Sequence, residues 1–184
     1  MIIESVSTSR KSERVSILTI KNWLDPVLRK KGKPIDNIDG TLVKLTEDMY
    51  ETTLDAKGVG LAANQVGLPY NLFVVDMGIQ KDDHDLITLI NPVITAMEGE
   101  EINEEGCLSI PEVYATIKRA THVEIKGIDL DGNDVRYEAE GFMARAFQHE
   151  IDHLKGSLFW DNLGKARRDL LKRKFRKMQK EKVA

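Results

Sequence analysis

Apolar residues recur at the spacing of an α-helix between Gly40 and Ala56. The side chains that would share one helix face are Leu42, Leu45, Met49 and Leu54. Thr41 can cap the first turn through its hydroxyl, and Gly58 suits the left-handed turn that often follows a helix. We therefore predict a helix over residues 40–56.

Four short runs in the middle of the chain have the β-rich composition typical of strands. They cover residues 71–76, 86–90, 122–130 and 134–138. The last two runs flank Asp131-Gly132-Asn133, which is a turn signal between paired strands. The middle of the chain is therefore predicted to be mostly antiparallel strand.

Helical spacing returns twice near the C-terminus. In residues 141–155 the apolar side consists of Phe142, Ala146, Phe147, Ile151 and Leu154, and Gly156 is placed to end the helix. We expect this helix to cross the core. Residues 165–182 are predicted to form a third helix, which is polar except for Leu170, Leu171, Phe175 and Met178. This thin apolar stripe predicts that the helix is only loosely attached to the rest of the domain.

The order of the elements predicts an α+β fold. Antiparallel β-sheets would pack around the central helix, followed by a C-terminal helix. Before the first helix, Pro26 and Pro34 argue against a long helix and favour an extended arm. A chain of 184 residues, 41% of them hydrophobic, is expected to form a single domain over residues 1–184.

The composition of the chain indicates in which cellular compartment we expect it. No stretch approaches the roughly 20 apolar residues of a membrane helix, and the N-terminus has no apolar segment of a secretory signal. We expect no membrane association. Cys107 is the single cysteine, so no intramolecular disulfide can form and the reducing cytoplasm is the expected location.

Positive charge is concentrated at the C-terminal end, although the whole chain has a net charge of −3. Residues 165–184 contain ten Lys and Arg residues and two acidic ones. Such a basic helix is usually a solvated face, and the alternative is a surface that binds nucleic acid.

The strongest chemical signal is the pattern His149-Glu150-Ile151-Asp152-His153 inside the second predicted helix. Residues four apart lie on one helix face, so both imidazoles can bind one metal ion while Glu150 reaches a water molecule beside it. Two ordinary structural histidines are the alternative, but this spacing around a glutamate favours a metal site.

A catalytic metal usually has three protein ligands, so a third must come from elsewhere in the chain. Cys107 is the candidate, because it lies in a glycine-containing turn, residues 105–111, between strand-like segments. Taken alone, a lone cysteine is more often a buried and inert side chain.

Three motifs in fixed order resemble those of the peptide deformylases. They are Gly58-Val59-Gly60-Leu61-Ala62-Ala63-Asn64-Gln65, Glu105-Gly106-Cys107-Leu108-Ser109 and Gln148-His149-Glu150-Ile151-Asp152-His153-Leu154. The looser similarity runs from about residue 25 to residue 159, with residues 1–16 as an N-terminal extension. The basic C-terminal helix, residues 165–184, resembles that of the bacterial branch of the family.

The resemblance implies hydrolysis of the N-formyl group of the initiator formylmethionine of nascent chains, with release of formate. It implies that the metal ligands are Cys107, His149 and His153. Glu150 would be the general base and acid, and the oxyanion donors would be the side chain of Gln65 and the backbone N–H of Leu108.

The resemblance also bears on substrate and metal. The backbone of Val59 and Gly60 would pair with an extended peptide. The methionine side chain would enter an apolar pocket walled by Phe142, Ala146 and Phe147. A thiolate ligand suits Fe(II), Zn(II), Ni(II) or Co(II), and the family points to Fe(II). For the basic helix, it supports contact with ribosomal RNA near the exit tunnel.

Two other functions remain as alternatives. One is a zinc endoprotease-like peptidase, although the G-x-x-H continuation found in metzincins is missing after His153. The other is a ribosome-binding protein with a vestigial metal site. Glu150 and Gln65 argue against it, because a structural site needs neither a general base nor an oxyanion donor.

Overall fold

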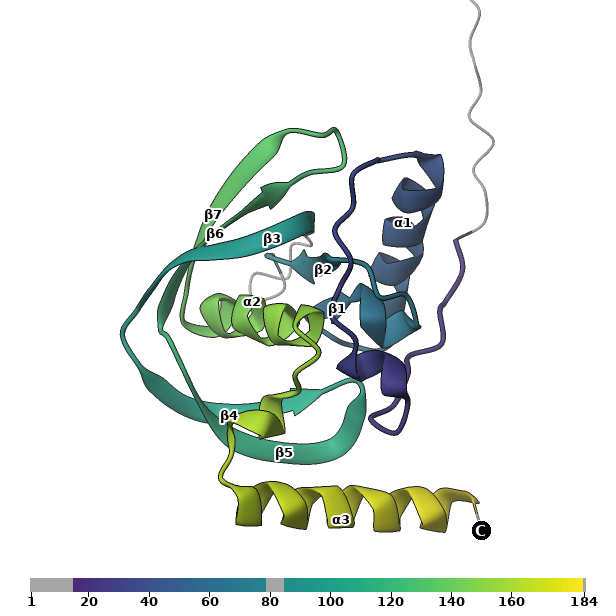
Figure 1. The fold of residues 1–184 in the computed structure, drawn as a ribbon, viewed down its shortest axis with the longest axis vertical. Helices are drawn as coiled ribbons and strands as arrows, with labels where there is room; N and C mark the ends of the chain where they lie inside the picture. The colour runs from purple at the N-terminus through teal and green to yellow at the C-terminus, as the bar shows by residue number, and fades with distance from the viewer. Residues whose placement is uncertain (1–14, 79–84, 184) are drawn as a thin grey trace, which may run out of the picture.

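The computed structural model describes residues 15–78 and 85–183, and Figure 1 shows their arrangement. The first fourteen residues of the predicted extension, residues 1–16, lie outside the described range. The helices are α1 (Gly40–Asp55), α2 (Gly141–Leu154) and α3 (Lys165–Val183), with short 3-10 turns η1 (Pro26–Arg29), η2 (Ala63–Val66) and η4 (Phe159–Asn162). The strands are β1 (Gly60–Ala62), β2 (Leu72–Asp76), β3 (Leu86–Glu98), β4 (Glu101–Cys107), β5 (Ile110–Arg119), β6 (His122–Ile128) and β7 (Asp134–Glu140).

The strands form two antiparallel sheets on either side of α2 (Figure 1). The larger sheet has the order β1-β2-β3-β6-β7, and the smaller is the β4-β5 hairpin. Phe147 and Ile151 of α2 pack with Phe73, Val75 and other buried residues of the larger sheet. The predicted α+β fold, with sheets around a central helix and a helix at the C-terminus, is confirmed.

Helix α1 covers the opposite face of the larger sheet, where Leu42 and Met49 pack with Leu61 and Leu72. The predicted cap at Thr41 is wrong. The helix begins at Gly40 and is capped by Asp39, whose carboxylate accepts a hydrogen bond from the N–H of Leu42 at 3.0 Å.

At its other end α1 finishes at Asp55, and the residue that takes the left-handed conformation is Lys57, with φ 54°. Gly58 was expected in that role. Because the left-handed residue directly follows the C-cap, here Ala56, the turn is complete before Gly58.

The predicted strands are present, and three further strands lie outside the predicted runs. The glycine-containing segment after α1 forms β1, and residues 101–119 form the β4-β5 hairpin. The first four residues of β4 are exposed, so its polar sequence carries no alternation of apolar and polar residues. Strand β3 also extends beyond residue 90, to Glu98.

Residues 15–25, the described part of the segment before η1, contain no helix or strand, as predicted, and backbone N–H groups among them donate to side chains of α1. Ser16 N–H donates to the carboxylate of Asp48, and Leu18 N–H donates to the hydroxyl of Thr52 at 2.8 Å. No helix among the described residues is long and apolar enough to cross a membrane.

Helix α3 is held more firmly than its thin apolar stripe suggested. The side chain of Phe175 is fully buried and makes edge contacts with the rings of Trp23 and Trp160. The guanidinium of Arg176 lies 4.8 Å from the centre of the Trp23 ring. One aromatic side chain that fills a hydrophobic cluster provides an attachment that a count of apolar residues underestimates.

Replacing Phe175 by alanine should lower the free energy of unfolding by about 3 kcal/mol, because it removes a fully buried aromatic side chain. Urea denaturation followed by tryptophan fluorescence measures this. Leu170 of the same helix is 57% exposed, so Leu170→Ala is the matched control and should change stability by less than about 0.5 kcal/mol. Equal losses in the two variants would contradict the anchoring role of Phe175.

Candidate active site

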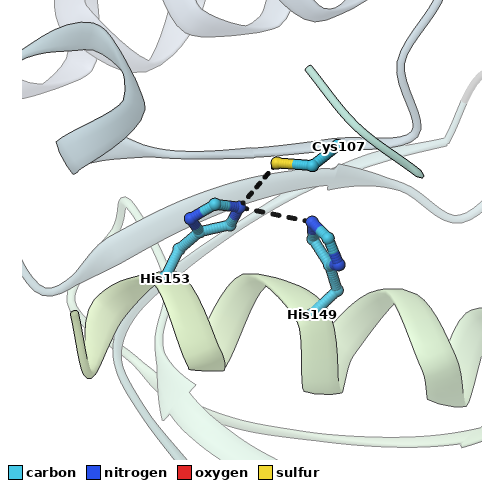
Figure 2. A group of neighbouring side chains, drawn as sticks. All are labelled: Cys107, His149 and His153. Atoms are coloured by element: carbon cyan, nitrogen blue, oxygen red, sulfur yellow. Dashed lines mark hydrogen bonds between the residues drawn. The ribbon is translucent and has the colours of Figure 1, made fainter. Parts of the chain in front are cut away.

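Three possible metal ligands converge between α2 and the end of β4 (Figure 2). The Nε2 atoms of His149 and His153 are 3.2 Å apart, and the Sγ of Cys107 is 3.2 Å from Nε2 of His153. All three ligand atoms lie within 4.8 Å of one another. Two imidazoles and a thiolate facing a common point are a donor set that fits one divalent ion of the first transition row.

Glu150 lies beside these atoms with little access to solvent. Its side chain is 4% exposed, and its Oε2 atom has no hydrogen-bond partner in the structure. Burial raises the pKa of Glu150 to about 7. A buried carboxylate with an unused oxygen and a raised pKa is suited to exchange protons with a reacting group.

The close approach of β1 sets the position of Glu150. A Cβ atom added to Gly60 would lie 2.8 Å from Oε1 of Glu150 and 3.0 Å from its Cδ and Cγ. Only glycine therefore allows β1 to pass this close to the carboxylate.

His149 is oriented by a second buried carboxylate, Glu105, whose Oε2 lies 3.2 Å from His149 Nδ1. Glu105 also accepts hydrogen bonds from Arg119 and Arg145 at 2.8 Å each. Burial alone would raise the pKa of Glu105, but hydrogen bonds from His149 and Arg119 outweigh it and lower the pKa to about 2. The ionised Glu105 thus accepts from Nδ1–H and leaves Nε2 to face Cys107 and His153. The sequence places Glu105 in the motif around Cys107 but does not predict that it orients His149. The motif is the only feature of the sequence that draws attention to Glu105.

Gln65 points its side-chain amide into the same site from η2. Its Oε1 accepts the N–H of Ala62 at 2.8 Å, which leaves Nε2 directed to Ser109 Oγ at 3.2 Å and Cys107 Sγ at 3.7 Å. Leu108 follows Cys107 in the turn between β4 and β5. The two expected oxyanion donors therefore come from two neighbouring turns, η2 and the turn between β4 and β5.

A cleft of about 610 Å³ opens over these residues. Its lining includes Val59, Gly60, Phe142 and Ala146, as expected from the sequence. Phe147 does not line the cleft. Its side chain is fully buried and lies 6.0 Å, ring centre to ring centre, from Phe73 in the core, because it faces the larger sheet.

Strand β1 forms one edge of the larger sheet and, among the described strands, pairs with β2 alone. Its first residue, Gly60, lines the cleft together with Gly58 and Val59, which precede the strand. A sheet edge inside a cleft can accept an extended peptide as an additional strand.

A thiolate and two histidines beside a buried carboxylate, in a cleft bordered by a sheet edge, define the class of H-E-x-x-H metal-dependent hydrolases. Comparison with known proteins identifies the family within this class. The family model described as polypeptide deformylase matches residues 17–169. The peptide deformylase of Syntrophobacter fumaroxidans is 49% identical over 170 residues, which cover 92% of this chain and 100% of that protein.

Comparison with solved structures leads to the same family. The crystal structure of a peptide deformylase from Legionella pneumophila superimposes with a TM-score of 0.85 at 40% identity, covering 91% of this chain and 98% of the other. That of the Ehrlichia chaffeensis enzyme in complex with actinonin has a TM-score of 0.84 at 32% identity and covers 92% and 99% of the two chains. The chain belongs to the polypeptide deformylase family, metal-dependent hydrolases that remove the N-formyl group from nascent peptides. This membership favours deformylation over the endoprotease and vestigial-site alternatives.

Replacing Gly60 by alanine should lower kcat/KM by about tenfold or more, because the added methyl group displaces the carboxylate of Glu150. Steady-state formate release from a formyl-Met peptide measures the change. Gly40→Ala is the control, since nothing lies within 4 Å of an added Cβ there. Full activity in a folded Gly60→Ala protein would show that this close approach does not position Glu150.

Proposed function

We propose that this chain acts as a single catalytic domain on formyl-Met nascent peptides and that Cys107, His149 and His153 hold one divalent metal ion. The observation that carries the assignment is the convergence of their three ligand atoms beside the unpartnered carboxylate oxygen of Glu150. A metal ion held there would polarise the formyl carbonyl and lower the pKa of a water molecule.

Glu150 is the proposed general base and acid. As the water oxygen bonds to the formyl carbon, Oε2 of Glu150 accepts a proton from the water. The bond between the formyl carbon and the methionine nitrogen then breaks, and the proton passes from Glu150 to that nitrogen. The products are formate and a peptide with a free amino terminus.

Gln65 and Leu108 are the proposed donors to the negative charge that develops on the former formyl oxygen. The Gln65 amide is held in advance by the N–H of Ala62, so its Nε2 needs no reorientation during the reaction. The backbone N–H of Leu108 would donate from the neighbouring turn between β4 and β5.

The peptide is proposed to bind along β1, with the backbone of Val59 and Gly60 as hydrogen-bonding partners. Phe142 and Ala146 line the cleft from α2 and are the proposed contacts for the methionine side chain. Phe147 is excluded from this set because its side chain faces the core.

The proposed metal in the cell is Fe(II), with Zn(II), Ni(II) or Co(II) as substitutes, because a thiolate and two imidazoles suit all of these ions. The proposed location is the cytoplasm, where nascent formylated chains are made.

The assignment of Cys107 and Glu150 is tested by anaerobic formate release and by metal analysis of the same samples. We expect Glu150→Ala to retain metal and lose at least about 100-fold in kcat, since it removes the proton acceptor but no ligand. Cys107→Ala should lose both metal and activity. A metal-loaded wild type that releases no formate would refute the proposed activity, and an active Glu150→Ala variant would refute the role of Glu150.

Contact with ribosomal RNA is proposed for the face of α3 opposite Phe175, which carries the exposed side chains Arg173, Lys177 and Lys180. Positive charges on one helix face can neutralise RNA phosphates, and such binding weakens with salt. Because Phe175 anchors α3, exchanging these charges tests the proposal more cleanly than deleting the helix.

The triple variant Arg173→Gln, Lys177→Gln and Lys180→Gln should lose co-sedimentation with ribosomes at low salt and keep its activity on a free formyl-Met peptide. A triple Gln variant of Lys30, Lys31 and Lys126, which are also exposed, has the same change of charge and should still co-sediment. Undiminished binding of the α3 variant would rule out this face of the helix.

A further inference from the structure

The N-terminal arm joins two turns that belong to different sheets. The backbone N–H of Lys21 donates to the carbonyl of Gln65 at 2.7 Å, and that of Trp23 donates to the carbonyl of Ser109 at 2.9 Å. Gln65 follows β1 of the larger sheet, and Ser109 lies in the turn of the β4-β5 hairpin. Within the described residues no strand pairing connects these sheets, so the arm supplies a backbone bridge between them.

The two bridged turns carry the donors proposed for the oxyanion. Gln65 Nε2 is 3.2 Å from Ser109 Oγ, and the residue before Ser109 is Leu108, whose N–H is the second donor. The side chains of Gln65 and Ser109 are buried, with exposed fractions of 1% and 0%. The spacing of the two turns therefore sets the spacing of the two donors.

Trp23 fixes the arm at this point. Its ring makes edge contacts with Trp160, at 5.0 Å between ring centres, and with Phe175, at 5.7 Å. The guanidinium of Arg176 covers one face of the ring at 4.8 Å from its centre. These contacts come from η4 and α3, so elements at the C-terminal end hold the bridge in place.

We propose that Trp23 is a positioning residue for the hydrolytic reaction. Its ring, held by Trp160, Phe175 and Arg176, keeps the arm against Ser109 and thereby sets the distance between the Gln65 amide and the Leu108 N–H. The proposal rests on the proposed function of Gln65 and Leu108 as oxyanion donors.

The effect should fall on kcat. Donors stabilise the developing charge only when they lie about 2.7–3.1 Å from the oxygen in the transition state, and a shift of about 1 Å removes much of that benefit. The metal ligands and the peptide-binding edge at β1 do not contact the arm segment 21–23 through any hydrogen bond among the described residues. Metal content and KM should therefore change little.

The test compares Trp23→Ala with Trp23→Phe in the metal-loaded full chain acting on a formyl-Met peptide. We expect kcat to fall about tenfold in Trp23→Ala and less than about twofold in Trp23→Phe, which keeps an aromatic ring. KM should change less than about twofold, and metal content should equal that of the wild type. Leu24→Ala is the matched control, because Leu24 is adjacent and 53% exposed, and its kcat should equal that of the wild type.

A second readout does not depend on turnover. The side-chain amide resonances of Gln65 should shift in Trp23→Ala and stay unchanged in Leu24→Ala, as measured by nitrogen-15 NMR. If Trp23→Ala does not fold, Trp23→Leu replaces it, since leucine keeps an apolar side chain but loses the ring contacts.

Several outcomes would overturn the proposal. They are unchanged kcat and unchanged Gln65 resonances in the folded variant, an equal loss of kcat in Leu24→Ala, and a loss of metal that accounts for the loss of activity. Failure of the proposed function itself would be distinguishable, because the wild type would then release no formate in the same assay.

Discussion

The geometry of the site depends on the hydrogen bonds that the buried carboxylate of Glu105 accepts. Glu105 comes from the β4-β5 hairpin and accepts hydrogen bonds from Arg119 of the same hairpin and from Arg145 of α2, and it contacts His149 Nδ1. A carboxylate buried this deeply would be costly if unpaired, and its partners make the ionised form the stable one. The charge that ties the smaller sheet to α2 is therefore also the charge that orients His149, one of the candidate metal ligands.

The site lies where three parts of the molecule meet. Helix α2 supplies two histidines and Glu150, the hairpin supplies Cys107 and Leu108, and the end of the larger sheet supplies Gln65 and the edge strand β1. Helix α2 and the larger sheet share one hydrophobic cluster, whereas the hairpin packs with η4 and α3 in another. Polar contacts that join the hairpin to the other parts include the Glu105 network and the backbone hydrogen bond from Trp23 of the arm to Ser109.

In this arrangement the N-terminal arm and the C-terminal elements η4 and α3 contact residues next to the site. The arm reaches the turns of Gln65 and Ser109, and its Trp23 is enclosed by aromatic and basic side chains of η4 and α3. A helix whose exposed face carries basic side chains is thus packed, on its other face, against a segment that contacts the site. The same helix combines a charged surface with a structural anchor, since Phe175 and the exposed cations occupy opposite faces.

The sequence alone determined the features that depend on local spacing. His149, Glu150 and His153 lie four residues or fewer apart on one helix, so their pattern predicts their common site, and the motif around Cys107 supplied the third candidate. Helical spacing of apolar residues likewise predicted α1 and α2, and short β-rich runs predicted most of the larger sheet. Tertiary structure decided the contacts between distant residues: the pairing of Glu105 with His149, 44 positions apart, the inward direction of Phe147, the burial of Phe175 and the bridge from Trp23 to Ser109. A local pattern cannot specify these contacts, because each depends on how separate elements pack and on which partner a buried group finds when water is excluded.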